Sequence, residues 1–174
     1  SDTILYAALG AAALALLLAV YFARWVLAAP PGNEKMVELG AAIRDGAMAF
    51  LRREYTWVAV FVLVMAVLIA TLLEWGRPWG AVAYVVGAGL SALAGFVGMR
   101  VATAANTRTA EAARTGGVVA ALPVAFRGGA VMGFTVAGLG ELGIGAGFLV
   151  FNNLLDEPNW VDIVTAIGLG GSSV

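Results

Sequence analysis

Four long apolar runs limit what this chain can fold into. A helix needs about 20 predominantly apolar residues to cross the hydrocarbon core of a bilayer. The runs cover about residues 4–23, 55–73, 80–99 and 128–151, and a fifth apolar, glycine-rich stretch at 160–174 is too short to cross. We therefore predict an all-α fold, a polytopic transmembrane helix bundle with four spanning helices and the start of a fifth. The first run follows Ser1, Asp2 and Thr3, without a basic residue, so it is interpreted as a spanning helix and not a signal peptide.

Composition removes most other classes of protein. Hydrophobic residues make up 61% of the chain and charged residues only 12%, whereas soluble domains have about 45–50% and about 25%. The net charge of −1 gives no field that would attract nucleic acid. The chain has no cysteine and no histidine, which excludes disulfides, thiolate metal sites and a histidine general base.

Basic residues alternate between the segments that join the apolar runs. There are none before the first run, then five, one, four and none in the following segments. The five are Arg24, Lys35, Arg44, Arg52 and Arg53, the one is Arg77, and the four are Arg100, Arg108, Arg114 and Arg127. Cytoplasmic loops carry the excess of Lys and Arg. The N-terminus is therefore predicted to lie outside, with both strongly basic segments in the cytoplasm.

The two basic segments are predicted to be helical extensions of the spans. Apolar residues recur at helical spacing at positions 36, 39, 43, 47 and 50, and Asn33 is a candidate N-cap after the break at Pro30, Pro31 and Gly32. One helix from about Asn33 to Leu73 would be roughly 60 Å long, twice the hydrocarbon thickness. The extensions are placed at about 33–54 and 100–114. The alternative is an amphipathic helix lying on the membrane surface.

Small residues recur every four positions on three of the runs. Such spacing allows helix backbones to approach closely in a membrane, so it predicts tightly packed interfaces. The three stripes are Ala83, Gly87, Ser91 and Gly95, then Gly129, Gly133 and Ala137, and finally Ala11, Ala15 and Ala19.

Glu141 is the one candidate site residue, because it is the ionisable residue deep within a run. It continues the stripe of Gly133 and Ala137 and is therefore predicted to face other helices, either as an ion-pathway group or as a buried, hydrogen-bonded carboxyl. Arg127 is interpreted as a snorkelling side chain. Asn106, Arg108, Thr109 and Glu111 form a polar patch interpreted as a solvated face. No catalytic, metal or substrate-binding residue is evident.

Four stretches resemble the membrane-integral pyrophosphatases, which couple hydrolysis of inorganic pyrophosphate to H⁺ or Na⁺ transport. They are NEKMVELGAAIRDGAMAFLRREY at 33–55, GMRVATAANTRTAEAAR at 98–114, AFRGGAVMG at 125–133 and IGLGGSS at 167–173. They occur in the family's order and extend over most of the chain.

The resemblance implies a much longer protein with about sixteen spanning helices of about 20 residues each. Residues 1–174 would be the N-terminal part of its single membrane domain, supplying outer, supporting helices. The family's Mg²⁺, pyrophosphate and ion-pathway residues lie on later helices, so none is carried onto this chain and Glu141 inherits no role. The resemblance also implies the lipid bilayer, the remaining helices, pyrophosphate, H⁺ or Na⁺ and a second copy as partners. A different polytopic transporter and a complete small membrane scaffold are the alternatives.

Overall fold

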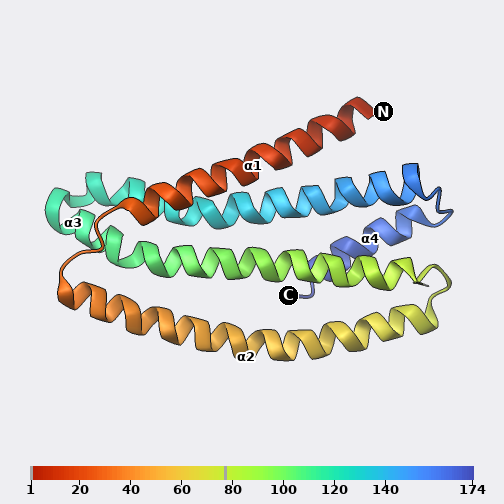
Figure 1. Cartoon of the computed structure of the whole chain (residues 1–174), viewed down its shortest axis with the longest axis horizontal. Helices are drawn as coiled ribbons and strands as arrows, with labels where there is room; N and C mark the ends of the chain where they lie inside the picture. Colours follow the sequence, from red (N-terminus) through yellow and green to blue (C-terminus); the bar gives the residue numbers. More distant parts are fainter. Residues whose placement is uncertain (1, 77) are drawn as a thin grey trace.

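The computed structural model describes residues 2–76 and 78–174 and is a bundle of long helices. The helices run roughly parallel to the long axis of the molecule, and short turns join them at its two ends (Figure 1). In chain order the elements are α1 (Asp2–Ala28), α2 (Glu34–Leu72), a 3₁₀ turn η1 (Glu74–Gly76), α3 (Trp79–Phe148), a π-helical segment η2 (Leu149–Leu154) and α4 (Trp160–Gly171).

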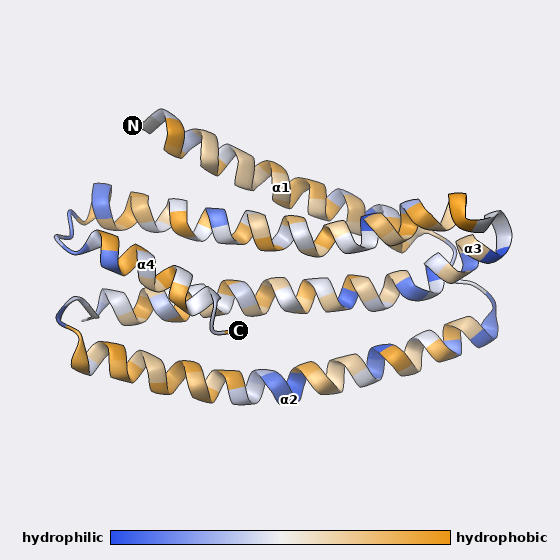
Figure 2. Ribbon diagram, turned by 180° about the vertical axis from the view of Figure 1, so that it is seen from behind, coloured by the Kyte–Doolittle hydropathy of each residue, from blue (hydrophilic) through white to orange (hydrophobic). Residues whose placement is uncertain are grey.

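The continuous helix α2 confirms the helix predicted from Asn33 to Leu73. The Asn33 side chain accepts a hydrogen bond from the Met36 backbone N–H at 3.0 Å, which makes Asn33 the N-cap. With 39 residues, α2 is about 58 Å long. A hydrophilic turn midway along α2 separates its most apolar half from a mixed half (Figure 2), as a helix that continues beyond a bilayer requires.

Helix α3 reverses direction at Gly117, which splits it into two antiparallel arms (Figure 1). Gly117 has φ 66° and ψ −164°, a conformation available essentially only to glycine. The arms approach closely because glycines line their contact: a Cβ at Gly98 would come within 2.7 Å of Met132 Cγ, and one at Gly128 within 2.8 Å of Ala105 Cβ. The helix predicted at 100–114 therefore continues to the reversal, and the second arm is already helical before residue 128.

Three of the described helices are long and apolar enough to cross a membrane. They are Thr3–Ala28, Glu34–Leu72 and Trp79–Leu154. The third contains both arms of α3, and these arms carry the apolar runs that the sequence placed at 80–99 and 128–151. An all-helical membrane bundle is thus confirmed as the class of fold.

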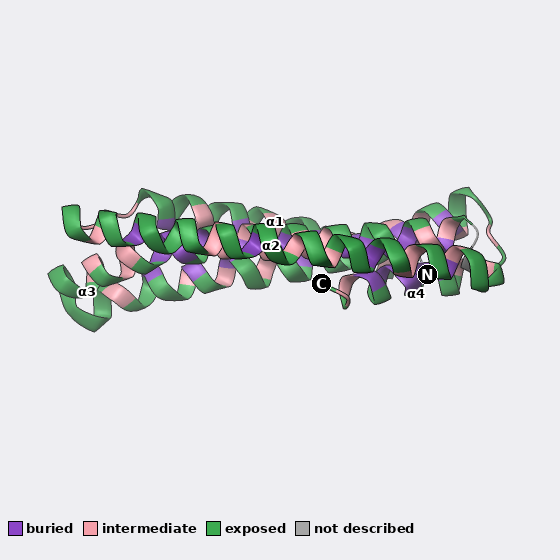
Figure 3. Ribbon diagram, turned by 90° about the horizontal axis from the view of Figure 1, so that it is seen from below, coloured by how far each residue is buried: buried purple, intermediate pink, exposed green. Residues whose placement is uncertain are grey.

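Side chains from α2, α3 and α4 form the core at the end of the bundle where α4 begins. Tyr84 and Ile163 are each 2% exposed there. Two ring pairs, Trp79 with Phe151 and Phe148 with Trp160, close this end with centroids 5.8 and 5.0 Å apart. Buried residues lie on the inward faces of the helices while the outward faces are exposed (Figure 3).

The stripe on the first arm of α3 is an interface, as predicted. A Cβ at Gly87 would overlap the backbone carbonyl of Ile167, and one at Gly170 would overlap that of Tyr84. Helices α3 and α4 therefore cross in backbone-to-backbone contact, which only glycine permits. On α1, Ala19 is buried and Ala15 partly buried, whereas Ala11 is exposed, so that stripe is only partly correct.

The stripe predicted on the second arm is wrong within this chain. Gly129, Gly133 and Ala137 are exposed, and a Cβ at either glycine would meet nothing within 4 Å. The packed face is rotated and carries Gly138 and Gly145, whose added Cβ atoms would lie within 2.9 Å of leucines of α1. Consecutive residues of an α-helix are about 100° apart around the helix axis. Ala137 and Gly138 therefore lie on different faces, although they are neighbours in sequence.

The apolar face predicted for residues 33–54 is also displaced. Leu39, Ile43 and Phe50 are at least half exposed, while Gly40 and Leu51 are buried. Gly40 faces Thr107 of α3, and a Cβ there would come within 2.5 Å of the threonine methyl group. Close approach to a neighbouring helix, more than side-chain size, sets this interface.

Candidate functional site

Glu141 lies on the second arm of α3 and is exposed on the surface of the chain. It lines an apolar cleft of about 530 Å³ between that arm and the N-terminal part of α1, together with Leu5, Ala8 and Phe148. The cleft forms because α1 diverges from α3 toward its N-terminus (Figure 1). The side chain of Glu141 makes neither a hydrogen bond nor an ion pair with residues 2–76 or 78–174. Within the described helices the Glu141 side chain is therefore not buried, and both roles given to it from the sequence stay predictions.

Arg127 and Trp25 stack at the opposite end of the same two helices. The guanidinium carbon of Arg127 lies 3.8 Å from the centroid of the Trp25 ring, within the range of a cation–π interaction. Tryptophan and arginine are both favoured where a helix leaves the hydrocarbon region. Arg127 is thus held against α1, a contact that its interpretation as a snorkelling side chain did not include.

Arg108 joins α3 to the end of α1. It donates from Nη1 to the Ala104 carbonyl at 2.8 Å and from Nη2 to the Leu27 carbonyl at 3.2 Å. Leu27 is in the last turn of α1, where backbone carbonyls lack partners within the helix. The side chain of Arg108 therefore caps α1 from 81 residues away in sequence.

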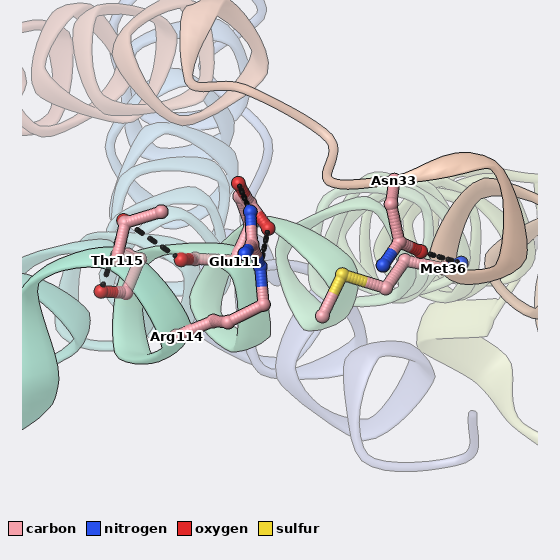
Figure 4. A network of polar contacts seen from close by, with 6 residues as sticks. Asn33, Met36, Glu111, Arg114 and Thr115 are labelled. Carbon is pink, nitrogen blue, oxygen red and sulfur yellow. Dashed lines mark hydrogen bonds and ion pairs between the residues drawn. The ribbon is translucent and has the colours of Figure 1, made fainter.

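Glu111 and Arg114 form an ion pair close to the reversal at Gly117. Arg114 donates from Nε and Nη2 to the two carboxylate oxygens at 2.8 and 2.7 Å (Figure 4). These hydrogen bonds lower the pKa of Glu111, against a smaller opposing effect of desolvation. Thr115 donates to the Glu111 carbonyl at 2.9 Å, so side-chain hydrogen bonds link residues of the last turn before the reversal.

The polar patch predicted as one solvated face is therefore divided. Arg108 contacts α1, and Glu111 pairs with Arg114. Asn106 and Thr109 instead line a separate cleft beside the second arm of α3. Sequence reasoning missed the contact of Arg108 with α1. The only signal was indirect: α1 ends before Pro30 and Pro31 without a basic residue in its last turn, so its carbonyls needed an outside donor.

These residues do not fit a magnesium site. Mg²⁺ is held by convergent carboxylate oxygens and water, and no group of three or more acidic side chains converges within 2–76 and 78–174. Glu38 pairs with Lys35 at 2.8 Å and Glu111 with Arg114. No catalytic step is assigned to any of them.

Comparison with known proteins identifies the family. The sequence pattern of the family described as "Inorganic H+ pyrophosphatase" matches residues 13–174. The "K(+)-insensitive pyrophosphate-energized proton pump" of Pyrobaculum aerophilum is 45% identical over 159 residues, covering 90% of this chain and 22% of that protein. The proton pump of the same description from Methanosarcina mazei is 36% identical over 173 residues, or 99% of this chain and 24% of that protein.

A relative described as pumping sodium matches as well. The "K(+)-stimulated pyrophosphate-energized sodium pump" of Thermotoga maritima is 40% identical over 141 residues, covering 80% of this chain and 19% of that protein. The chain thus spans less than a quarter of the length of these relatives. A family pattern that covers nearly the whole chain, an apolar helical bundle and relatives of this similarity agree: the chain belongs to the inorganic H⁺ pyrophosphatase family.

Proposed function

We propose that residues 1–174 are the N-terminal part of an ion pump that couples hydrolysis of inorganic pyrophosphate to translocation of H⁺ or Na⁺. The observation that carries this proposal is the similarity of 99% of the chain to one pyrophosphate-energized pump. Because proton and sodium pumps are both similar to this chain, the ion is left as either of the two.

Within that pump these helices have a supporting role. Pyrophosphate carries several negative charges, and Mg²⁺ held by convergent carboxylates would neutralise them during hydrolysis. The acidic side chains described above are dispersed or already paired with basic ones. The metal ligands and the groups that contact pyrophosphate therefore belong to other parts of the complete protein.

The topology proposed is four crossings with the N-terminus outside. α1, the apolar half of α2 and the two arms of α3 would cross, and α4 would enter from the outer side. The fold supports this because the end of α1, the start of α2 and the reversal of α3 share one end of the bundle (Figure 1). Arg44, Arg108, Arg114 and Arg127 lie toward that end. We call it the arginine-bearing end and place it in the cytoplasm. Two copies would assemble as a homodimer.

Single cysteines test the orientation. Cysteines at Thr3 and Asn153 should react with an impermeant reagent in intact cells, and cysteines at Glu34 and Ala113 only after the membrane is opened. All four positions are exposed, so a lack of reaction reports the side of the membrane and not burial. Reaction at Glu34 in intact cells would reverse the orientation.

Activity is tested by comparing two lengths of the protein. The complete protein in sealed vesicles should release phosphate from pyrophosphate with Mg²⁺ and form an ion gradient, whereas residues 1–174 alone should do neither. The control is the triple change Glu34→Ala, Glu38→Ala and Asp45→Ala in the 174-residue chain. If the unchanged 174-residue chain released phosphate and the triple change abolished that release, the catalytic groups would lie on these helices.

Glu141 is tested separately within the complete protein. Glu141→Gln keeps the shape and removes the charge, so it should leave pyrophosphate hydrolysis and ion transport unchanged if the helices only support the pump. Retained hydrolysis with reduced ion transport would instead place Glu141 on the ion pathway.

A further inference from the structure

Arg108 is a partly buried cation with no acidic partner within residues 2–76 and 78–174. Both of its hydrogen bonds go to neutral backbone carbonyls, and its Nε is enclosed without an acceptor. Buried charges in proteins are normally paired with an opposite charge, because desolvation is costly without one. The guanidinium is thus incompletely satisfied by its own chain.

The surroundings of Arg108 carry excess positive charge. Burial lowers the pKa of Arg108, and the positive charge of Arg44 on α2 lowers it further. Glu111 is the one acidic side chain along the same cleft, but both of its oxygens already accept hydrogen bonds from Arg114. An additional anion beside Arg108 would relieve both the missing acceptor and the repulsion.

An open cleft of about 470 Å³ adjoins Arg108 at the arginine-bearing end. It lies between the end of α1 and both arms of α3 near their reversal, and its walls are mostly apolar. The apolar lining includes Trp25, Ala29, Pro30, Ala112, Ala120 and Val124, and Thr115 adds a hydroxyl. Trp25 also carries the stacked Arg127, which places the Trp25 side of the cleft at the level where helices leave the hydrocarbon region.

We propose that this cleft binds an anionic phospholipid, with the headgroup phosphate on Arg108 and the glycerol and upper acyl chain against the apolar walls. Basic pockets between transmembrane helices on the cytoplasmic side bind such headgroups. Inorganic phosphate offers the same anionic oxygens but gains nothing from apolar walls, so the lining favours the lipid. The proposal depends on membrane insertion and not on the pumping activity.

Native mass spectrometry of the complete protein tests the site. The protein, in mild detergent, is titrated with phosphatidylglycerol and, in parallel, with phosphatidylcholine. We expect tighter binding of phosphatidylglycerol, and Arg108→Gln should weaken that binding about fivefold. The matched control is Arg100→Gln, which removes the same charge from an exposed position on the same arm and should leave binding unchanged.

A second variant keeps the charge and fills the space. Ala112→Leu should narrow the cleft and weaken binding of phosphatidylglycerol while Arg108 remains. It decides the result if Arg108→Gln fails to fold, because Arg108 also caps α1. Unchanged lipid binding by a folded Arg108→Gln protein, or by Ala112→Leu, would overturn the proposal. So would displacement of the lipid by inorganic phosphate at equal concentration, which would indicate a site for the free anion.

Discussion

The Tyr84 hydroxyl donates a hydrogen bond to Ser173 Oγ at 2.8 Å, and Ser173 in turn donates to the Leu169 carbonyl at 2.8 Å. This relay ties the first arm of α3 to the end of α4, 89 residues later. Tyr84 is only 2% exposed, so its hydroxyl has no water to replace a lost partner. The relay and the glycine crossing at Gly87 together hold α4 against the first arm of α3.

Removing one side of this relay should destabilise the bundle modestly. Tyr84→Phe should lower the free energy of unfolding by about 0.5–1.5 kcal/mol, measured by thermal unfolding in detergent. Ser173→Ala leaves the buried tyrosine hydroxyl unpaired and should cost at least as much. If the two residues interact directly, the double variant should cost less than the sum of the single ones. Strict additivity would contradict the contact.

Two glycines on the same turn of α3 should respond oppositely to alanine. Gly87→Ala places a methyl group into the Ile167 backbone and should cost about 1–3 kcal/mol through overpacking. Gly89→Ala is the matched control, because a Cβ there meets nothing within 4 Å. It should stabilise the helix by about 0.5–1 kcal/mol, the usual gain of alanine over glycine. Equal melting temperatures for the two variants would show that the crossing does not depend on Gly87.

The Glu111–Arg114 pair should make the reversal of α3 sensitive to acid. Arg114 lowers the pKa of Glu111 in the folded chain. The pair therefore stabilises the fold at pH values above the ordinary glutamate pKa of about 4.3. This stabilisation is lost as the pH falls through the lower pKa that Glu111 has in the folded chain. The wild-type protein should therefore melt above Glu111→Gln at neutral pH, and the difference should vanish in acid. A difference that grew on acidification would refute the assignment.

Local signals allowed α2 to be predicted from sequence, whereas the faces of α3 could not be. Two prolines and a glycine precede Asn33, which caps the helix, and no proline follows before residue 73. These signals lie in the local sequence and do not depend on other helices. The second arm of α3 has glycines on several faces, so spacing alone did not distinguish Gly133 from Gly138. What separates them is the position of α1, which is a tertiary property.

Contacts between distant residues were equally inaccessible. Arg108 reaches Leu27 because α1 and the first arm of α3 lie side by side at the arginine-bearing end, and no local pattern carries that information. Glu141 shows the converse: its sequence environment is apolar throughout, and only the divergence of α1 places it beside an open cleft.

Gly117, at the reversal of α3, should be sensitive to substitution even though a Cβ there meets nothing within 4 Å. A side chain at φ 66° and ψ −164° is strained whatever space surrounds it, and such conformations cost about 1–3 kcal/mol. Gly117→Ala should therefore lower the melting temperature and speed tryptic cleavage at Arg114, three residues before the reversal. Gly46→Ala is the control, since Gly46 is exposed within α2 and a Cβ there meets nothing within 4 Å; it should stabilise instead. If Gly117→Ala were as stable as Gly46→Ala, the two arms would be joined by a conformation that does not require glycine.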